Sequence, residues 1–215
     1  MLSPTLEPKP HSEQALRLLD AAMHEFADRG FDAASVREIC KRAGMNVASV
    51  NYYFGDKERL YIEAVKRAHV CSAEGPFPDF PPDAAPVDML RGFIAVMVGR
   101  MHAPASPSAM KLMMREMADP GKAAHVVVQE FIQPVAFRLR EILTALLPDR
   151  DPAQVLMVRF SVMGQILFYR QNRPVAELIF GKEPVDALGL EMVTDHVTRF
   201  TLAALGLGEP VGGRR

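Results

Sequence analysis

The sequence has few of the features that mark secreted and membrane proteins. Only two cysteines, Cys40 and Cys71, occur in 215 residues, too few for a disulfide framework, so we expect a reducing, cytoplasmic setting. There is no run of about 18 apolar residues, and a membrane span is therefore not expected. The opening stretch MLSPTLEPKPHSE lacks the apolar segment of a secretion signal. The formal net charge is only −1, so any contact with nucleic acid must come from a local patch.

The motifs of enzymes and metal sites are also missing. There is no GxSxG, no dinucleotide fingerprint and no HExxH, and the two Gly-Lys pairs, at 121–122 and 181–182, do not fit a P-loop. Four histidines are scattered without the spacing of metal ligands: His69, His102, His125 and His196. We therefore expect no catalytic residues, no metal and no cofactor.

Helical periodicity dominates what is present. Strand signals are nearly absent, and long stretches of 3.6-residue periodicity are broken by Pro and Gly, which predicts an all-α fold. The pattern predicts a flexible arm, a compact helical unit, a Pro-rich loop, a larger helical domain and a disordered tail, at residues 1–11, 12–71, 72–86, 87–208 and 209–215.

Capping signals set the helices of the compact unit. Ser12 caps a helix that ends near Arg29, with Gly30 as its stop. The stretch Ser35-Val-Arg-Glu38 is a capping box, in which serine and glutamate reciprocally satisfy backbone donors, and it starts a short helix ending at Ala43-Gly44. Further helices are predicted at about 47–54 and from Asp56 to about Cys71.

The larger domain is predicted to contain five helical segments. Pro134 should kink or split the third of them, because proline lacks a backbone N–H. The segments are about 87–102, 107–118, 122–147, 152–172 and 186–206.

Residues 36–53 have the spacing of a helix-turn-helix. Counting from Val36, a small residue, Cys40, falls fifth, where two helices approach most closely, and Gly44 falls ninth, where the turn needs a positive φ. Apolar or small residues stand where the helices face each other and their base: Ile39, Ala43, Met45 and Val50. We interpret the segment as a helix-turn-helix, a DNA-binding motif.

The second helix of this motif separates its side chains by face. At about 100° per residue, Val50 and Phe54 project to one side, while the small residues Ala48 and Ser49 face outward with Tyr52. An outward face of small residues lets a helix sit deep in the major groove.

Polar groups around that face suit DNA contacts. Asn51, at the margin, can read a base edge, and a tyrosine hydroxyl can reach a phosphate. Lys57 opens the next helix, where free N–H groups already favour phosphate. The alternative is that both tyrosines fill the core. For Tyr53 the two interpretations are balanced, whereas the outward direction of Tyr52 argues against burial.

The run FADRGFDAASVREICKRAGMNVASVNYYFGDKERLY resembles the N-terminal domain of TetR-type transcriptional regulators over residues 12–71, joining GF, the capping box, AG, YYF and K-x-x-L in order. Two positions depart from the family pattern. Tyr53 replaces a common histidine, and Val47 replaces a common basic or polar residue, so base readout should depend more on apolar contact and shape. The resemblance implies DNA contacts at Arg37, Asn46, Val47, Ala48, Ser49, Asn51, Tyr52, Tyr53 and Lys57.

The C-terminal half carries further resemblance. The stretches REMADP (115–120) and GQILFYRQNRP (164–174) resemble the CecR-type branch of that family. Helix-turn-helix proteins read half-sites about 34–36 Å apart, which requires a dimer. In the family, the last two long helices pair across a two-fold axis, here 152–172 and 186–206. The alternative is a monomer whose central helix is 152–172. Candidate dimer contacts are Val155, Val158, Val162, Ile166, Met192, His196 and Phe200.

The middle of the chain is rich in methionine, which suits a pocket that adapts to varied apolar ligands, although methionine at helical spacing also forms ordinary core. Arg170 could pair with Glu116 or another acid, or bind an anion. The effector-pocket candidates are Met97, Met101, His102, Met110, Met113, Met114, Phe131, Met163, Gln165, Leu167, Tyr169 and Arg170.

The sequence therefore predicts a dimeric, sequence-specific DNA-binding transcriptional regulator, a repressor by the family default, with no membrane partner. Its partners would be a double-stranded operator, a small-molecule effector and a second copy of the chain. The alternative is a regulator that responds to oxidation through Cys71, since Cys40 occupies the small buried position of the motif.

Overall fold

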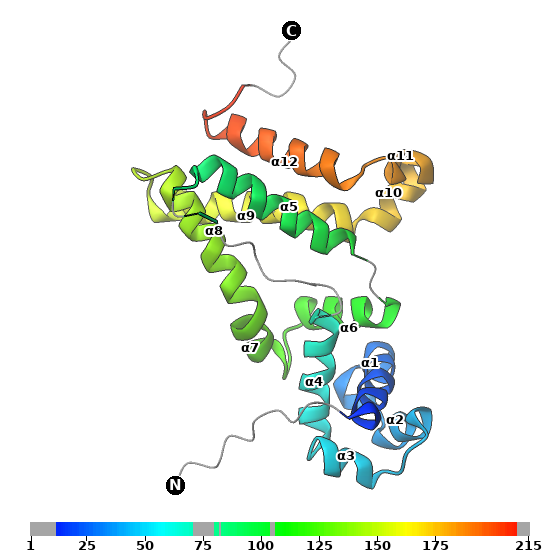
Figure 1. Ribbon diagram of the computed structural model, residues 1–215. Coiled ribbons are helices and arrows are strands. Elements are labelled where there is room, and N and C mark those ends of the chain that lie inside the picture. The colour runs from blue at the N-terminus through cyan, green and yellow to red at the C-terminus, as the bar shows by residue number, and fades with distance from the viewer. Residues whose placement is uncertain (1–11, 71–79, 82, 104–105, 210–215) are drawn as a thin grey trace, which may run out of the picture. The chain divides into compact units, whose positions relative to one another are not determined.

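The computed structural model describes residues 12–70, 80–81, 83–103 and 106–209, and all regular structure in these ranges is helical (Figure 1). The predicted all-α fold is confirmed. The predicted arm at 1–11, Cys71, most of the Pro-rich loop and the end of the tail lie outside the described residues. Within the described ranges, no helix is both long and apolar enough to cross a bilayer.

The helices form two compact units, each described by itself. The first unit comprises, among the described residues, 12–70 and 106–131, and the second comprises 80–81, 83–103 and 132–209. The helices of the first unit are α1 (Glu13–Ala33), α2 (Val36–Ala43), α3 (Ala48–Tyr53), α4 (Lys57–Val70), α6 (Pro107–Ala118) and α7 (Ala124–Val127). The helices of the second unit are α5 (Pro86–His102), α8 (Gln133–Leu146), α9 (Pro152–Gln171), α10 (Arg173–Phe180), α11 (Lys182–Asp186) and α12 (Leu190–Ala204).

The division between the units differs from the boundary drawn from sequence. Residues 106–131, which were assigned to the larger domain, pack with the N-terminal helices, because α6 contacts both α1 and α4. The face of α6 that makes this packing is buried and carries Ala109, Leu112 and Glu116. The first unit is therefore larger than a helix-turn-helix domain that stops at 71.

The caps of the first helices follow the sequence closely. Ser12 Oγ accepts a hydrogen bond from the Ala15 N–H at 3.3 Å, and Asp56 Oδ1 accepts one from the Arg59 N–H at 2.8 Å. Gly30 has φ 75° and ψ −179°, so the regular part of α1 is interrupted at the predicted stop. A side chain at this position would also come within 3.1 Å of the Arg115 guanidinium carbon.

The capping box of α2 is made differently from the prediction. Ser35 Oγ does accept a hydrogen bond from the Glu38 N–H at 3.4 Å. The Ser35 N–H, however, donates to Glu25 of α1 at 3.3 Å instead of to Glu38. Glu25 is buried and is also paired with Arg29 at 3.2 Å. The reciprocal half of the cap therefore ties the start of α2 to α1.

A buried carboxylate joins three elements of the first unit. Glu116 of α6 is 5% exposed, and its Oε2 accepts a hydrogen bond from the Tyr61 hydroxyl of α4 at 2.5 Å. Its Oε1 accepts the Gly121 and Ala123 N–H groups at 2.9 and 3.1 Å, just before α7. Burial, followed by the bond to Glu116, raises the pKa of the Tyr61 hydroxyl. A charged acceptor with three donors holds α4, α6 and the start of α7 in one arrangement.

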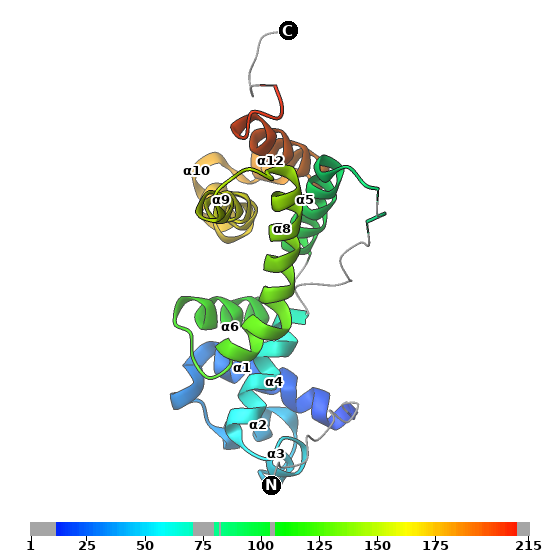
Figure 2. The ribbon, with the colours of Figure 1, turned by 90° about the vertical axis from the view of Figure 1, so that its left-hand side faces the viewer.

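The second unit is organised around an aliphatic core. Helices α5, α8, α9 and α12 contribute buried side chains to one cluster that includes Phe93, Ile94, Leu143, Ile166 and Val197. Figure 2 shows α9 almost end-on beside α8, with α5 and α12 on the other sides of the cluster.

Two short helices follow α9, between the predicted segments 152–172 and 186–206, where the sequence interpretation placed no helix. Pro174 stands in the first turn of α10, and Gly181 ends that helix with φ 86°. The chain then forms α11 and resumes with α12 at Leu190, four residues after the predicted start at 186. Both breaks carry the Pro and Gly signals that normally mark helix ends.

The predicted break near Pro134 is present. A π-helical segment, η1 (Val128–Ile132), follows α7 and leads into α8, with Pro134 in the first turn of α8. Proline cannot donate to the carbonyl four residues earlier, which favours a local change in helical hydrogen bonding.

Candidate DNA-binding interface

The turn between α2 and α3 has the geometry of a helix-turn-helix. Gly44 lies in the left-handed region with φ 68° and ψ 35°, and the Met45 N–H donates to the Cys40 carbonyl at 2.8 Å. Arg17 of α1 donates from Nη2 to the Ala43 carbonyl at 2.9 Å, which fixes the end of α2. A residue with a side chain would be strained at Gly44, so this turn depends on glycine.

The start of α3 is set by Asn46. Its Oδ1 accepts hydrogen bonds from the Ser49 N–H at 3.1 Å and from the Ser49 hydroxyl at 3.3 Å. This is the bonding of a helix cap. Asn46 was considered from sequence only as a DNA contact, and the structure gives it a local structural role in addition.

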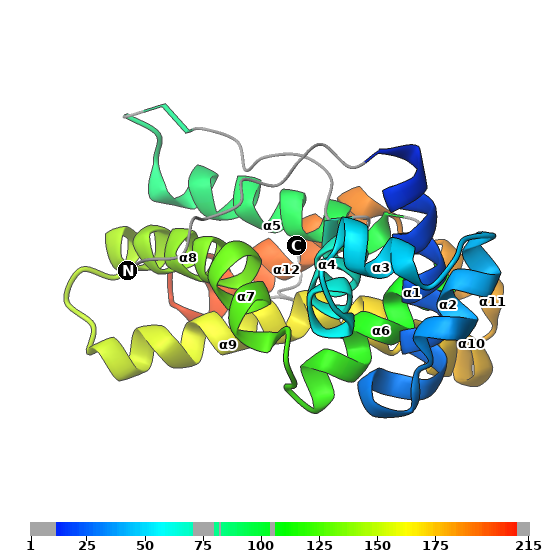
Figure 3. The same cartoon turned by 90° about the horizontal axis from the view of Figure 1, so that it is seen from below.

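The two faces of α3 separate as the periodicity predicts. Val50 and Phe54 are buried, whereas Val47 and Tyr52 are 51% and 81% exposed. Most other predicted DNA contacts are also exposed, namely Arg37, Asn46, Ala48 and Asn51, and Ser49 is half-buried. In Figure 3, which views the structure from below, α3 lies next to α2 and α4 on the side toward the viewer. The arrangement presents small and polar side chains outward from a short, firmly capped helix.

Tyr53 is half-buried, so it is neither a fully exposed DNA contact nor a core residue. Its hydroxyl donates to Gln14 Oε1 at 3.1 Å, and its ring meets that of Tyr52 edge-on at 4.8 Å between centroids. The hydroxyl therefore attaches α3 to the first turn of α1. No local signal in the sequence marks Gln14 or Arg17 as partners of the motif, because both reach it across the tertiary fold.

Lys57 at the start of α4 is held by the end of α1. Its Nζ donates to the Asp32 carbonyl at 3.2 Å and lies 4.8 Å from the centre of the Phe31 ring. Lys122 lies 5.1 Å from the same ring and pairs with Glu58 at 2.6 Å, which raises the pKa of the Lys122 amine. Two cations thus flank Phe31 beside the N-terminus of α4.

Cys40 is packed as predicted. It is 1% exposed, and burial raises the pKa of its thiol, which makes the reactive thiolate scarce. Cys71, on which the oxidation-sensing alternative depends, lies outside the described residues. In the ranges the structure covers, no group of three or more His, Cys, Asp or Glu side chains is placed to hold a metal ion.

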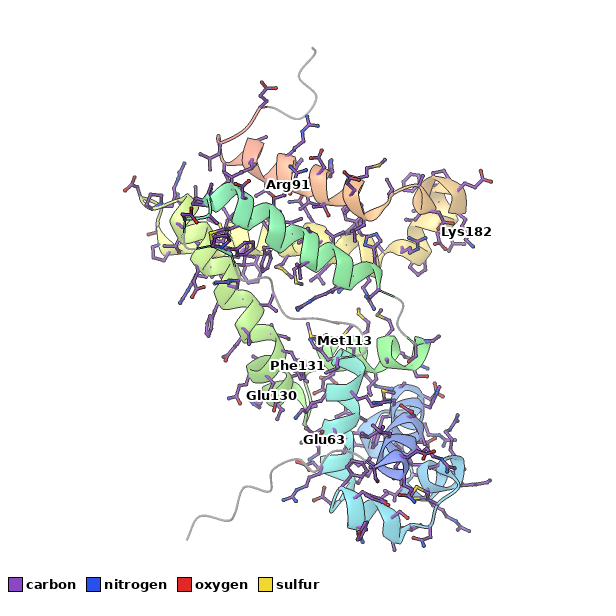
Figure 4. All side chains as sticks on the ribbon, viewed as in Figure 1. Glu63, Arg91, Met113, Glu130, Phe131 and Lys182 are labelled. Carbon is purple, nitrogen blue, oxygen red and sulfur yellow. The ribbon has the colours of Figure 1, made fainter. Side chains whose placement is uncertain are left out.

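The predicted effector residues are divided between the two units. Those in the first unit are Met110, Met113, Met114 and Phe131, and those in the second are Met97, Met101, His102, Met163, Gln165, Leu167, Tyr169 and Arg170. Phe131 contacts the His69 ring at 4.8 Å, and Figure 4 places it next to Glu130, which shares Lys66 with Glu63 of α4.

The methionines of the second unit belong to its core. Met97 is buried in the aliphatic cluster, and Met101, Met163 and Tyr169 pack against it. Two of the polar candidates bond within their own helices: His102 Nδ1 lies 2.9 Å from the Val98 carbonyl oxygen, and Gln165 donates to the Ser161 carbonyl at 3.3 Å.

Glu116 and Arg170 each bond to groups of their own unit. The Glu116 oxygens accept bonds from Tyr61 and two backbone groups, all within the first unit. Arg170 instead donates from Nη1 to the carbonyls of Arg100 and Met101, at 3.0 Å each. Its partners are therefore the last carbonyls of α5, an arrangement that α-helix C-termini favour.

The predicted dimer residues fall on both sides of α9 and α12. Val155, Val162 and Ile166 are buried in the chain's own aliphatic core, and Val158 is half-buried. Val155, Val162 and Ile166 were predicted to face a partner, but the chain's own core covers their side chains. Met192, His196 and Phe200 of α12 are exposed. The exposed large apolar side chains of α9 are Leu156, Met157, Phe160 and Phe168.

Two family models match the chain. One, described as bacterial regulatory proteins of the tetR family, matches residues 18–64. The other, described as the C-terminal domain of the HTH-type transcriptional dual regulator CecR, matches residues 86–205.

Relatives and solved structures agree with these matches. The chain is similar to the HTH-type transcriptional dual regulator CecR of Shigella flexneri, at 28% identity over 199 residues, covering 86% of this chain and 89% of the relative. It is also similar to the HTH-type transcriptional regulator RutR of Escherichia coli (strain K12), at 24% identity over 198 residues, covering 87% and 88%. The crystal structure of HlyIIR, a hemolysin II transcriptional regulator, matches this chain with a TM-score of 0.56 at 22% identity. The match covers 88% of this chain and 99% of the HlyIIR chain, and it shows that the two share a fold.

Proposed function

The chain belongs to the TetR family of bacterial transcriptional regulators and carries a CecR-type C-terminal domain; from this premise we propose that it acts as a homodimeric repressor whose operator binding is released by a small-molecule effector. The family resemblance seen in the sequence is confirmed, as is the prediction that the protein is not an enzyme, since the family consists of DNA-binding transcriptional regulators.

The observation that carries the proposal is the outward face of α3. Helix α3 has Val50 in the core and Ala48 and Asn51 exposed, with Val47 exposed just before it, and Tyr52 is its one large exposed side chain. A short helix with such a face can enter the major groove. Because Val47 is exposed and apolar, we expect it to contact a thymine methyl or to read groove shape. Asn51 is expected to read a base edge, and Tyr52 and Lys57 to contact phosphates.

The proposed dimer surface lies on the outer sides of α9 and α12, which contact each other through the core. Met157, Phe160 and Phe168 are spaced so that they share one side of α9, and Phe160 is 70% exposed. Gly164 lies on the same side, where a side chain would meet no atom within 4 Å, so a partner helix could approach closely. This set replaces Val155, Val162 and Ile166, which the chain's own core covers.

A dimer built on this surface would have to hold two α3 helices about 34 Å apart, one turn of DNA. The apolar character of the surface supports an obligate contact, since exposed patches of this kind are rare on proteins that remain monomeric. The effector is expected to bind among the methionines of the second unit.

The test is a binding assay of the full chain on the DNA upstream of its own gene. We expect nanomolar-range, palindrome-dependent binding that weakens steeply with salt and is lost on a scrambled palindrome of equal length. A panel of small molecules, added at fixed salt, should contain a class that releases the DNA. Binding that ignores the palindrome would contradict sequence-specific recognition.

The sign of regulation needs a separate measurement. In vitro transcription from the same promoter should fall on adding the protein and recover with the effector. The Shigella flexneri relative is named a dual regulator, so the assay must be able to register an increase as well. An increase in transcription would contradict the repressor proposal without affecting DNA recognition.

A further inference from the structure

Arg170 is anchored by only one of its terminal nitrogens. Nη1 donates to the carbonyls of Arg100 and Met101 at the end of α5, at 3.0 Å each. These two bonds fix the plane of the guanidinium group, because its nitrogens share one rigid plane. The remaining donors therefore point in a determined direction.

Those remaining donors are buried and unsatisfied. Among the residues the structure describes, Arg170 Nε and Nη2 have no hydrogen-bond partner, although neither atom is accessible to solvent. A buried charged group without its hydrogen bonds is costly, and such groups usually have an explanation in a ligand, a water or a functional role. The N–H groups on Nε and Nη2 are parallel and lie on the same edge of the guanidinium, which is the pair that binds a carboxylate or phosphate with two bonds.

No acid of the described chain neutralises this cation. The contrast with Arg173, three residues further on, is direct: Arg173 pairs with Glu177 at 2.9 Å and with Asp186. Arg170 forms no ion pair within the described ranges, and burial alone lowers the pKa of its guanidinium.

The surroundings of Arg170 are apolar. Met163, Leu167 and Arg170 follow at i, i+4 and i+7, so they share one side of α9. Met101, whose carbonyl binds Arg170, and Met163 both pack on the aliphatic cluster. Burial also raises the pKa of the neighbouring Tyr169 hydroxyl, another sign of a dry environment. In such surroundings a charge-assisted pair of hydrogen bonds is stronger than in water.

We infer that the effector carries an anionic head, a carboxylate or a phosphate, joined to an apolar body, and that Arg170 Nε and Nη2 bind the head. The apolar body lies against Met101 and Met163, which are half-buried and whose flexible side chains accept varied shapes. The inference rests on the proposed function, because it assigns a chemical class to the effector of that proposal. It also explains why Arg170 has two donors without partners in the described parts of the chain, whereas Arg173 is ion-paired.

The experiment follows the Nε–H resonance of Arg170 in the full-length, ¹⁵N-labelled protein, identified by its loss in Arg170→Lys. Three probes share one chain length: octanoate, octyl phosphate and octanol, each titrated at constant ionic strength. We expect octanoate or octyl phosphate to shift the resonance to saturation, and octanol to leave it in place. The head group with the lower Kd then identifies the preferred anion.

The variants sharpen the result. Arg170→Lys keeps the charge but removes the two parallel donors, and should weaken anion binding by about 10- to 100-fold. Arg140→Lys changes an exposed arginine of α8 and should leave the affinity unchanged. If Arg170→Lys fails to fold, the difference between octanoate and octanol binding to the wild-type protein tests the inference, because it needs no variant. The Nε–H resonance is then assigned by triple-resonance spectra.

Three outcomes would overturn the inference: equal affinity for octanoate and octanol, equal anion affinity in wild type and Arg170→Lys, or no anion that moves the resonance. Operator binding is measured on the same preparations. If any of these outcomes occurs while palindrome-dependent DNA binding is intact, the anion site is wrong and the proposed DNA recognition is unaffected. If sequence-dependent DNA binding is lost while an anion still saturates the response, the DNA recognition is wrong and the anion site is supported.

Discussion

The two units of the chain hold their helices together by different means. In the first unit, polar bonds fix the packing: Glu116 binds Tyr61, Glu25 binds the Ser35 N–H, and Arg17 binds the Ala43 carbonyl. In the second unit, an aliphatic cluster does so. The surfaces differ in the same sense. The outer face of α3 is small and polar apart from Val47 and Tyr52, whereas α9, α10 and α12 expose large apolar side chains.

The difference indicates how each unit meets its partners. A face that must lie against a hydrated, charged duplex gains from small and polar side chains on a firmly held helix. A face that is apolar and uncovered is favourable only when another apolar surface buries it. The clearest example is α10, which has no buried residue and whose Leu178 is 87% exposed. In the second unit, Arg170 Nε and Nη2 also have no hydrogen-bond partner among the described residues. The first unit thus has its buried polar groups largely satisfied internally. The second has exposed apolar side chains and, at Arg170, buried donors without a hydrogen-bond partner within the part of the chain that the structure describes.

Breaking the apolar surface of α9 should have the largest effect. Phe160→Glu would place a charge in the proposed dimer contact, and we expect the dimer Kd to rise by more than about 100-fold, or about 3 kcal/mol. Analytical ultracentrifugation across a concentration series measures this directly. The matched control is Phe137→Glu, which changes another exposed phenylalanine of the same unit, on α8.

The pair of variants also tests which surface is used. An unchanged dimer in Phe160→Glu together with dissociation in Phe137→Glu would move the contact from α9 to α8. Dissociated Phe160→Glu should retain its helical content by circular dichroism, because Phe160 is exposed in the single chain.

Removing the buried carboxylate should destabilise the first unit alone. In Glu116→Gln one of the two oxygen acceptors becomes an NH2 group, so either the Tyr61 hydroxyl or the Gly121 and Ala123 N–H groups lose their acceptor. We expect a loss of about 2–3 kcal/mol in the free energy of unfolding. Hydrogen exchange followed by mass spectrometry should show faster exchange in α4 and α6 and unchanged exchange in α12.

The control for this variant is Glu38→Gln. Glu38 is solvent-exposed, and its ion pair with Lys41 is long, at 4.0 Å. It should change the free energy of unfolding by less than about 0.5 kcal/mol. Equal losses in both variants would mean that the Glu116 bonds do not hold the unit together.

Two substitutions should separate base reading from phosphate contact. Asn51→Ala should cost about 1–3 kcal/mol and change the base preference at one position of each half-site. Lys57→Ala should weaken binding to all sequences alike and reduce the salt slope by about one. Competition binding against single-position operator variants, over a salt series, distinguishes the two patterns.

The structure adds one condition to the Lys57 result. Because Lys57 also binds the Asp32 carbonyl, its removal could loosen the start of α4, so thermal unfolding is measured in parallel. An unchanged melting temperature with relaxed sequence preference would contradict the phosphate assignment. A uniform loss in Asn51→Ala would count against base reading.

The smallest effect concerns pH. The pKa of Tyr61 is raised in the folded protein, first by burial and then by the bond to Glu116. The unfolded tyrosine titrates near pH 10. Below about pH 10 the contribution of Tyr61 to the free energy of unfolding is fully present. Above that pH the unfolded chain releases the tyrosine proton while the folded chain keeps it. The free energy of unfolding therefore falls as pH rises toward the folded pKa, by up to about 1.4 kcal/mol per pH unit.

Urea unfolding between pH 8 and 11 measures this slope. Tyr61→Phe removes the titrating group and should give a shallower dependence in the same range. A slope that is the same in both proteins would assign the alkaline loss to other groups.

The helix-turn-helix could be predicted because its signals are local. Ser35 and Asp56 precede their helices, Gly44 stands where the backbone is left-handed, and the spacing of Val50 and Phe54 sets which side of α3 is buried. Each signal acts within about one helical turn, so the sequence alone contains it. The breaks at Pro174 and Gly181 are local as well and could have been read in the same way.

Other features depend on which surfaces meet. The sequence by itself determined that the chain is helical, where the motif lies and which side of α3 faces outward. Only the tertiary structure decided that α6 packs on α1 and α4, that Glu25 completes the cap of α2, and which side of α9 the chain's own core covers. Helical periodicity cannot decide the last point, because α9 is apolar nearly all round and either side could have been buried. Burial is a property of pairs of surfaces, and the second surface of each pair lies far away in the sequence.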